Sequence, residues 1–276
     1  MIFESKTMNL NFKNALCYLT FKELDKYDFI KHAYTTRLGG ISENEFKSLN
    51  FSFASKDNKD CVNENYNIFC DSIGIDRYNL AVTSQVHENK ICVVTKKNMK
   101  SGDEIFTSFE DTDGLITSEY EIGLVTSHAD CCAIYMIDIN KKIIGLAHAG
   151  WRGTVKNIAG KLAEKFINHY NSSPDDIISA LGPSIGGCCF EVEKSLLDNF
   201  YSLDIPSTYM HSCENSERIR IDLLEVNRQL LLKAGIKDKN IFKSDICTMC
   251  NHDLLFSHRA TKGKRGTNIA YLSLIS

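Results

Sequence analysis

The sequence lacks an excess of cationic charge and lacks any long apolar run. Its 32 Lys and Arg residues stand against 35 Asp and Glu residues, which gives a formal net charge of −3. Binding of nucleic acid or of an anionic membrane by electrostatics alone is therefore disfavoured. No apolar stretch approaches the roughly 18–20 residues that span a bilayer, and the first residues, MIFESKTMNLNFK, lack the apolar core of a signal peptide. We expect a cytoplasmic protein with no nucleic-acid partner and no membrane partner.

Proline is scarce as well, with three residues, and no repeat, low-complexity tract or Pro/Ser-rich linker divides the chain. Domains usually contain about 100–200 residues, so a chain of this length has room for an ordinary core. We therefore treat residues 1–276 as one domain with an irregular N-terminal third.

Cysteine, in contrast, is abundant. Eleven cysteines are an odd number in a large chain for which we expect no secretory leader, and this is typical of reduced thiols rather than disulfides. Two pairs are adjacent, Cys131-Cys132 and Cys188-Cys189. Neighbouring side chains of an extended strand point to opposite faces. We expect at most one cysteine of each pair to face a given site.

Short apolar runs predict strands in the middle and the C-terminal part of the chain. The expected strands cover residues 122–126, 133–139, 143–147, 177–181, 241–246 and 268–275. Brief, turn-like connections separate them. The pattern indicates the strand component of a mixed α/β fold.

Helices are expected after glycine-containing turns. Gly150-Trp151-Arg152-Gly153 precedes residues with the spacing of one helix face, and Thr154 is the expected N-cap. The residues of that face are Val155, Ile158, Leu162 and Phe166. Further helices are expected over 192–200 and over 223–234, the latter ending near Gly235. Strand, glycine turn and helix form the local unit.

Residues able to bind a metal gather at the predicted strand ends. Cys131 and His148 lie at two such ends, and His87 is the candidate third ligand. Two imidazoles and one thiolate suit Zn²⁺ and leave a fourth position open for water or substrate. The gaps between the three residues do not match a recognised zinc spacing, so residue chemistry alone indicates the site.

Several motifs, taken in order, make the chain resemble a known family. They are Thr35 to Gly40, Ser48-Leu49-Asn50, Gln85-Val86-His87, Thr112 to Thr117, Ala129-Asp130-Cys131, Ala147 to Gly153, Gly182 to Val192 and Phe256 to Arg259. The family carries the names laccase-domain and multicopper polyphenol oxidase, and is also described as zinc-dependent purine nucleoside phosphorylases. The resemblance covers nearly the whole chain.

This resemblance implies a fold, a reaction and a set of site residues. The implied fold is a four-layer α/β/β/α sandwich with mixed sheets, similar to cytotoxic necrotizing factor-type cysteine hydrolases. The implied reactions are phosphorolysis of adenosine, inosine and methylthioadenosine, and deamination of adenosine. The partners are a purine nucleoside and phosphate, and the protein is expected to be a monomer or a homodimer. Position by position, the metal ligands fall on His87, Cys131 and His148, and substrate-binding residues on Arg37, Asn50, Arg152 and Arg259. The three ligand residues, together with Arg37 and Arg152, are the expected catalytic residues.

Two arginines have a physical reason to bind phosphate. Arg37 and Arg152 each flank glycines, so a guanidinium and exposed backbone N–H groups could hold an anion together. Arg152 also precedes a predicted helix, whose N-terminal dipole attracts anions. A solvated salt bridge is the alternative for each. Trp151, the single tryptophan, could stack on a purine or pack against the core.

Other interpretations of the cysteines remain open. Cys247 and Cys250, with His252 and His258, could form a structural zinc site, which we disfavour because no second C-x-x-C follows. Cys188 or Cys189 could be a nucleophile, although burial as a small apolar side chain is the simpler role. The chain departs from the family pattern at Ala133, Phe190, His258 and Ala260, and none of these changes removes a proposed ligand.

Two other functions compete with phosphorolysis. Copper-dependent oxidation of phenols would need about ten His ligands over several copper centres, more than the 8 His of this chain, so copper is disfavoured relative to zinc. A non-catalytic protein that binds purines or cell-wall precursors is the other alternative. Retained zinc and purine binding without turnover would distinguish it from an enzyme.

Overall fold

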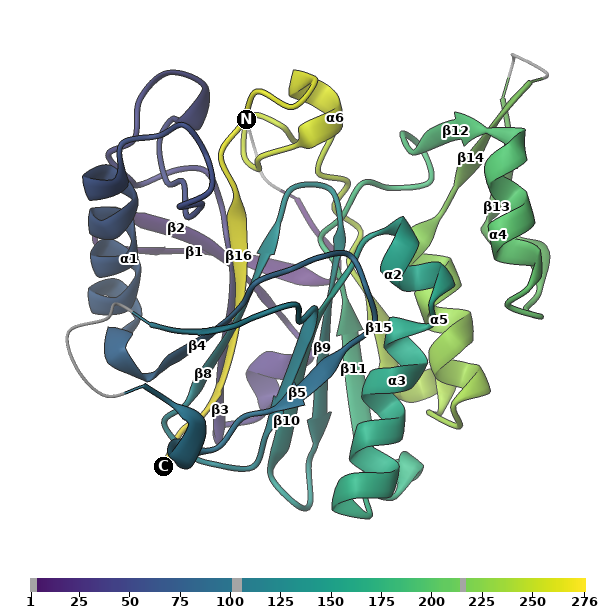
Figure 1. Ribbon diagram of the computed structural model, residues 1–276, viewed down its shortest axis with the longest axis horizontal. Coiled ribbons are helices and arrows are strands. Elements are labelled where there is room, and N and C mark those ends of the chain that lie inside the picture. The colour runs from purple at the N-terminus through teal and green to yellow at the C-terminus, as the bar shows by residue number, and fades with distance from the viewer. Residues whose placement is uncertain (1–3, 101–105, 214–216) are drawn as a thin grey trace.

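The computed structural model describes residues 4–100, 106–213 and 217–276. Within these residues, two large mixed sheets pack face to face (Figure 1). The first has seven strands in the order β1 (Met8–Lys13), β2 (Leu16–Phe21), β3 (Ile30–Thr35), β16 (Asn268–Leu274), β8 (Gly123–His128), β4 (Leu80–Thr83) and β6 (Thr107–Phe109). Strand β4 pairs parallel with both β6 and β8, and the other pairs are antiparallel.

The second sheet, as far as the chain is described, has six strands. Their order is β15 (Ile241–Lys243), β11 (Ile177–Leu181), β9 (Cys132–Asp138), β10 (Ile143–Ala149), β7 (Gly114–Thr117) and β5 (Ile91–Val93). The outer pairs β11–β15 and β5–β7 are parallel, and the inner pairs are antiparallel. A small third sheet joins β12 (Glu191–Glu193), β14 (Arg218–Ile221) and β13 (Met210–Ser212).

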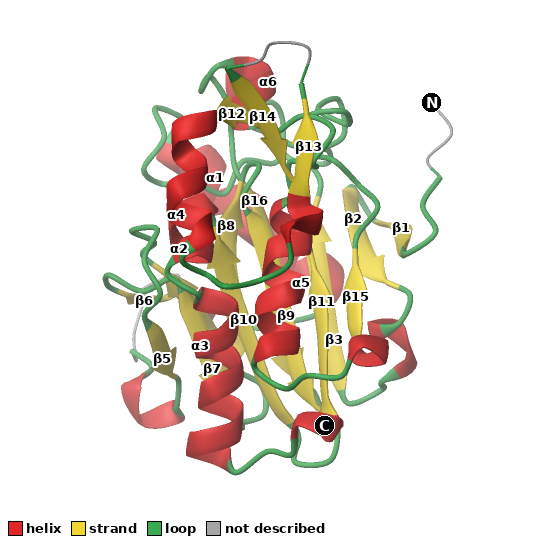
Figure 2. Cartoon of the chain, turned by 90° about the vertical axis from the view of Figure 1, so that its right-hand side faces the viewer, coloured by secondary structure: helices red, strands yellow, loops and turns green. Residues whose placement is uncertain are grey.

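Helices cover the outer face of each large sheet, so the molecule has four layers, α/β/β/α (Figures 1 and 2). Helix α1 (Lys59–Ile73) packs on the first sheet, with Val62 and Phe69 in one apolar cluster with Val125 and Tyr271. Helices α3 (Ile158–Glu164) and α5 (Leu223–Lys233) pack on the second sheet. The expected four-layer mixed α/β fold is confirmed.

Strand β9 shows why the apolar runs are continuous rather than alternating. Its residues Ile134 and Met136 belong to the core beneath α3 and α5, whereas Tyr135 and Ile137 belong to the core between the two sheets. A strand covered on both faces needs apolar side chains at every position. All seven residues of β9 are buried.

The predicted helix after the glycine turn is interrupted. Helix α2 (Trp151–Val155) begins after Gly150 as its N-cap, and α3 begins after Asn157, whose backbone φ is 60°. The side chain of Asn157 accepts a hydrogen bond from the Gly160 N–H at 3.1 Å. The assignment of Thr154 as N-cap was therefore wrong: Thr154 is buried inside α2. The apolar face itself is confirmed, because Ile158 and its successors line the core beneath the helices.

The N-terminal third, expected to be irregular, instead contains strands β1, β2, β3 and β4 and the long helix α1, so this expectation was wrong. The other predicted elements agree with the structure except for one segment. Residues 192–200, expected as one helix, form β12, a 3-10 turn over Lys194–Leu197 and the short helix α4 (Asp198–Tyr201). Strand β12 forms because its residues pair with β14 across the small sheet, a long-range contact that periodicity does not reveal. A further short helix, α6 (His258–Thr261), precedes β16. No helix in the described part of the chain has the length and apolar character needed to cross a membrane.

Candidate metal site and its cavity

Both large sheets contribute to one candidate metal site. Cys131 lies between the end of β8 and the start of β9, His148 lies near the end of β10, and His87 follows β4. The ligand atoms of these three residues lie within 4.8 Å of one another. The imidazole rings of His87 and His148 are 4.8 Å apart at their centroids and nearly perpendicular. The structure thus brings together the three predicted ligands, two nitrogens and one sulfur.

A single buried carboxylate, Asp113, holds two of the three ligand residues. It precedes β7 and is fully buried. Its two oxygens accept hydrogen bonds from the backbone N–H groups of Val86, His87 and Glu88 at 2.9–3.1 Å. Its Oδ1 also lies 2.9 Å from Nδ1 of His148. With Nδ1 engaged in this way, Nε2 of His148 is left for a metal, the usual arrangement of a carboxylate behind a ligating histidine.

Asp113 was not among the predicted site residues, although it lies in the motif Thr112 to Thr117. A buried aspartate directly before a strand was the available signal, because such a carboxylate needs several donors.

The electrostatics of the site favour a thiolate at Cys131. Burial alone raises the pKa of this thiol, but the adjacent His148 and His87 outweigh burial and bring the pKa down to about 6. Burial lowers the pKa of His148, and the Cys131 and Asp113 charges outweigh burial and raise the pKa to about 9. The thiolate is the form of cysteine that binds metals. Cys131 is therefore close to its ligating state at neutral pH.

A third imidazole, that of His128, supports the site without facing it as a ligand. Its Nε2 lies 2.7 Å from the Thr126 hydroxyl, and its Nδ1 lies 3.1 Å from the carbonyl oxygen of Cys131. Burial, together with the charge of His148, lowers the pKa of His128 well below its ordinary value. His128 therefore stays neutral and positions the backbone of Cys131.

Gly150 is required at the turn after β10 for a packing reason. A Cβ atom built at this position would lie 3.0 Å from Sγ of Cys131 and 3.0 Å from Cδ2 of His87. Such contacts are tighter than ordinary van der Waals contacts. The glycine lets the backbone pass directly behind two of the ligand residues.

The three ligand residues line a cavity of about 470 Å³. One wall is aromatic, and its rings come from Phe51, Phe53, Tyr66 and Phe106. Within this wall, Phe53 and Tyr66 are stacked with centroids 5.8 Å apart. The volume and the mixture of an apolar wall with a few polar groups are typical of a small-molecule site.

Arg265 lines this cavity and was not among the predicted site residues. Its Nη1 donates to the Thr267 hydroxyl at 2.8 Å and to the Gly266 carbonyl oxygen at 3.1 Å. Its Nε is buried and has no hydrogen-bond partner in the described structure. Burial lowers the pKa of Arg265, and Cys131 and Asp130 counteract this. A half-satisfied guanidinium beside the ligand residues can bind an anion.

Two of the predicted substrate-binding arginines are engaged elsewhere and do not line the cavity. The guanidinium of Arg37 donates to the carbonyl oxygens of Lys47 and His252 at 2.9 and 3.0 Å. Arg259 donates from Nη1 to the Glu191 carbonyl oxygen at 2.9 Å. Both side chains hold chain segments together.

Asn50 and Arg152 lie near the cavity but not in its wall. The Asn50 side chain is buried and donates to Ser55 and Asp57, while its oxygen accepts from the backbone N–H groups of Ser52 and Thr267. It orders the loop that carries Phe51 and Phe53, two of the rings of the aromatic wall. Arg152 is exposed, and its guanidinium lies 4.5 Å from the centroid of the Trp151 ring, the next residue after Gly150.

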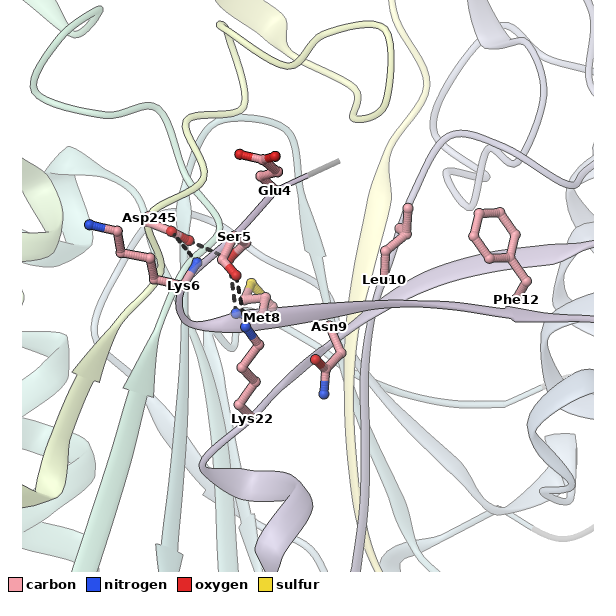
Figure 3. Close-up of a pocket in the computed structure, with 9 residues that line it drawn as sticks. All are labelled: Glu4, Ser5, Lys6, Met8, Asn9, Leu10, Phe12, Lys22 and Asp245. Atoms are coloured by element: carbon pink, nitrogen blue, oxygen red, sulfur yellow. Dashed lines mark hydrogen bonds between the residues drawn. The ribbon is translucent and has the colours of Figure 1, made fainter. Parts of the chain in front are cut away.

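A larger hollow of about 880 Å³ lies elsewhere, beside β1 (Figure 3). Its residues come mainly from the first strands, and Ser5 and Lys6 hydrogen-bond to Asp245 there at 2.5 and 2.7 Å. It contains none of the candidate metal ligands. Its mixture of polar and apolar side chains offers no convergent set of reactive groups, and the smaller cavity is the better candidate site.

The adjacent cysteine pairs behave differently from each other. Cys131 faces the site, and Cys132 lies in the core beneath the helices, as expected for a strand. For the other pair the expectation was wrong, because Cys188 and Cys189 lie in a turn and both approach Cys250, at Sγ–Sγ distances of 3.8 and 3.3 Å. Neither His252 nor His258 joins this group among the described residues.

Comparison with known proteins agrees with the resemblance drawn from the motifs. Residues 31–275 match the family described as multi-copper polyphenol oxidoreductase laccase. Purine nucleoside phosphorylase YlmD of Bacillus subtilis is 31% identical over 242 residues, which cover 87% of each chain. Its namesake in Geobacillus stearothermophilus is 35% identical over 240 residues, covering 86% of this chain and 88% of that one.

Solved structures extend the comparison to the fold. The YlmD structure from Geobacillus stearothermophilus superposes with a TM-score of 0.90 at 29% identity, covering 99% of this chain and 100% of the other. A Bacillus licheniformis protein, YfiH, superposes with a TM-score of 0.89 at 32% identity, covering 97% of this chain and 98% of the other. From the motifs, the fold and this family match, the chain belongs to the multi-copper polyphenol oxidoreductase laccase family.

Proposed function

We propose that the chain is a purine nucleoside phosphorylase that acts in the cavity lined by His87, Cys131 and His148. One observation carries this proposal: the three ligand residues, a buried arginine and an aromatic wall all line the same cavity. The names of the relatives from Bacillus subtilis and Geobacillus stearothermophilus support the same reaction. The proposed substrates are adenosine, inosine and methylthioadenosine, with deamination of adenosine as a second activity.

In phosphorolysis, an oxygen of inorganic phosphate forms a bond to C1′ of the nucleoside, and the bond from C1′ to the purine nitrogen breaks. The bonding electrons leave with the base, which takes up a proton, and ribose 1-phosphate is the second product. Arg265 would hold the phosphate through its free guanidinium edge, since a guanidinium can bind two phosphate oxygens at once. Fixing the nucleophile next to the sugar removes most of the entropic cost of the encounter.

The donor set fits zinc as the resident ion. His87, Cys131 and His148 would hold it, and three protein ligands leave one coordination position open. When bound, zinc supplies Lewis acidity towards an oxygen of phosphate or water. The Cys131 thiolate and the Asp113 carboxylate would balance the charge of the ion, so the positive charge that attracts an anion would come from Arg265. Asp113 keeps His148 in the tautomer that ligates.

The aromatic wall fits the flat base of a nucleoside. Phe53, Tyr66 and Phe106 lie within 5.5–5.8 Å of one another at their ring centroids. Rings of this kind stack on a purine and exclude water from the breaking bond. The fully buried Tyr66 and Phe51 are held by edge-to-face packing at 5.0 Å, so this wall is preorganised.

Oxidation of phenols by several copper centres fits the geometry poorly. Among the described residues, one group of candidate ligands contains histidine, and it offers two imidazoles. A multicopper oxidase needs several histidine-containing ligand groups that lie close to one another in space. The donor set of this chain therefore favours zinc and transfer to phosphate.

The proposal is tested by incubating purified, zinc-loaded protein with adenosine, with and without phosphate, and separating the products by chromatography. Adenine and ribose 1-phosphate should form only with phosphate, and inosine should form in its absence. Cys131→Ser and His148→Ala should lose metal and both activities together, because three ligands leave little redundancy. Phenol oxidation that tracks copper content, or zinc and purine binding without turnover, would contradict the proposal.

A further inference from the structure

A second group of metal-binding atoms lies outside the cavity. The sulfur atoms of Cys188, Cys189, Cys247 and Cys250 all lie within 4.8 Å of one another. None of these residues lines the cavity of the first site. We propose that the four thiolates hold a second zinc ion, which serves a structural role and does not depend on the proposed reaction.

The spacing of the sulfur atoms matches a tetrahedral ion. Zinc–sulfur bonds of about 2.3 Å in tetrahedral geometry place the sulfurs about 3.8 Å apart. The Sγ atom of Cys188 lies 3.6 Å from that of Cys189 and 3.8 Å from that of Cys250. The Sγ atoms of Cys189 and Cys250 are 3.3 Å apart. Small side-chain rotations are enough to bring four sulfurs at these distances around one ion.

Two segments far apart in sequence supply the ligands in pairs. The turn after β11 carries Cys188 and Cys189, and the C-x-x-C turn before α6 carries Cys247 and Cys250. Ser184 and Cys247 form an isolated parallel bridge, and the Thr248 N–H donates to the Ser184 carbonyl oxygen at 3.0 Å. The backbone therefore aligns the two pairs before any ion binds. A second C-x-x-C is unnecessary because the adjacent cysteines replace it.

The turn is shaped to receive an anionic sulfur. The Gly186 N–H donates to Sγ of Cys247 at 3.2 Å, a contact that stabilises a thiolate. A Cβ at Gly186 would lie 3.2 Å from Sγ of Cys188 and 3.2 Å from Cβ of Cys247. Glycine at this position therefore lets the two cysteine segments approach each other. Nearby, Arg220 donates to the Cys188 carbonyl oxygen at 3.3 Å and offsets part of the negative charge of four thiolates.

A disulfide explains the cluster less well than an ion. Adjacent residues are about 3.8 Å apart at Cα, below the 4.4–6.8 Å usual for a disulfide, so Cys188 and Cys189 are poorly placed to bridge each other. A bond from either of them to Cys250 would leave two thiols unused at the same point. Four sulfurs that converge on one point are the donor set of a structural zinc site. Four ligands also saturate the ion, which leaves no open position for catalysis.

The second site is linked to the first through Asp130, the residue before Cys131. The Thr248 hydroxyl donates to Oδ1 of Asp130 at 2.6 Å, and the Ile185 N–H donates to its carbonyl oxygen at 2.8 Å. These two donors lie in the two cysteine-bearing segments. An ion that joins the segments therefore fixes Asp130, which has a positive φ of 88°, and with it the backbone that presents Cys131.

Metal analysis of variants tests this inference. Protein purified with zinc under reducing conditions should contain about two zinc ions per chain, one for each ligand group. Cys188→Ser and Cys250→Ser should each lower the content to about one, and Cys131→Ser with Cys250→Ser should lower it to near zero. Cys61→Ser in α1 is the matched control, since this cysteine belongs to neither group, and it should retain both ions.

X-ray absorption at the zinc edge on the unaltered protein gives a second measurement that needs no variant. Two occupied sites predict an average of about 2.5 sulfur ligands per zinc, against about one for the first site alone. Two results would overturn the inference. One is a single zinc per chain that Cys250→Ser leaves in place. The other is a zinc-free cluster in which mass spectrometry finds a disulfide to Cys250.

Discussion

A single side chain, Asp113, sets the geometry of the candidate metal site. Its carboxylate accepts three backbone N–H bonds from the loop carrying His87 and a fourth bond from the His148 ring. Burial raises the pKa of this carboxyl, but the hydrogen bonds and the charge of His148 outweigh burial and lower it. Asp113 is therefore ionised, which lets it accept from all four groups. Asparagine at this position would direct its NH2 group, a hydrogen-bond donor, towards N–H groups that are donors themselves.

We expect Asp113→Asn to weaken zinc binding about 10- to 100-fold, the usual effect of removing a carboxylate behind a ligating histidine. The affinity can be measured by competition with a chelator of known zinc affinity. Asp76→Asn is the control, because Asp76 caps a short turn through one backbone N–H and asparagine can do the same. Equal affinities for Asp113→Asn and the control would show that Asp113 does not organise the site.

At the same scale, the proposed function gives phosphate binding to Arg265, which lines the cavity. We expect Arg265→Lys to keep its zinc and to raise the KM for phosphate about tenfold, because lysine keeps the charge but loses the two-pronged hydrogen bonding. Phosphate-free deamination should fall less than phosphorolysis. From the sequence, Arg152→Lys is also expected to lower phosphorolysis more than deamination. Because Arg152 is exposed in the structure, we expect its replacement to lower phosphorolysis less than that of Arg265. Steady-state kinetics of both reactions decide between the two arginines, and equal losses in both reactions would assign Arg265 to folding instead.

At the scale of elements, the turn from β10 into α2 connects the metal site to the helical layer. Strand β10 ends at Ala149, directly after His148, Gly150 passes behind the ligand residues, and α2 starts at the next residue. The helical segment then breaks at Asn157 and restarts as α3, so two short helices follow the sheet instead of one long one. Both short helices contact α5 and β10, and the Asn227 amide of α5 donates to the Thr154 hydroxyl of α2 at 3.1 Å.

We expect Gly150→Ala to lower zinc affinity more than it lowers the stability of the metal-free protein. The backbone of Gly150 has φ −72° and ψ 170°, which alanine adopts without strain, so the cost arises from the contacts of Cβ with Cys131 and His87. The change is checked by chelator competition together with denaturant unfolding of the metal-free protein.

Gly74→Ala is expected to have the opposite effect, which is a loss of stability without a loss of zinc affinity. Gly74 ends α1 with φ 69°, and a Cβ there would have open space around it apart from Lys31 at 4.0 Å. Alanine at this position should cost about 1 kcal/mol of stability through backbone strain and leave zinc affinity unchanged. A pattern in which both variants lose stability equally and keep full zinc affinity would contradict the role given to Gly150.

At the scale of the whole molecule, the two sheets share a core that contains a neutral histidine. His32 of β3 lies 6.2 Å, ring to ring, from Tyr135 of the other sheet. Its Nε2 accepts a hydrogen bond from the Phe21 N–H at 2.9 Å, so this nitrogen carries no proton. Burial lowers the pKa of His32 to about 4, although Asp25 acts in the opposite direction.

Stability should consequently fall in mildly acidic solution. The pKa of His32 is about 6.5 when unfolded and about 4 when folded, so the unfolded chain binds more protons between these values. The contribution of His32 to the free energy of unfolding is present in full above the pKa that His32 has in the unfolded chain. This contribution is lost as the pH falls towards the pKa that His32 has in the folded protein. Between about pH 7.5 and about pH 5, the loss should be of the order of 2 kcal/mol.

Denaturant unfolding of the wild type and of His32→Gln at these two pH values tests this expectation. Glutamine can accept the Phe21 N–H bond but does not titrate, so its stability should fall less across the same interval. The difference between the two proteins isolates His32 from the other titrating groups. Identical pH dependences would mean that the pKa of His32 is the same in the folded and the unfolded protein, which would contradict this expectation.

The sequence by itself determined the local properties of this protein. Apolar runs predicted β9, β10, β11 and β16, because strands covered on both faces carry apolar residues at every position. Residue chemistry selected His87, Cys131 and His148, and the motif series identified the family and its four layers. These properties depend on residue type and short-range order, which a single sequence records directly.

Only the tertiary structure decided which distant residues meet. Arg265 enters the cavity, Arg37 and Arg259 do not, and Asp113 reaches both His87 and His148, because strands from two sheets converge there. Likewise, a turn after β11 lies beside Cys247 and Cys250 through a single parallel bridge. Contacts of this kind depend on sheet order and loop closure across many residues, and hydrophobic periodicity carries no information about either.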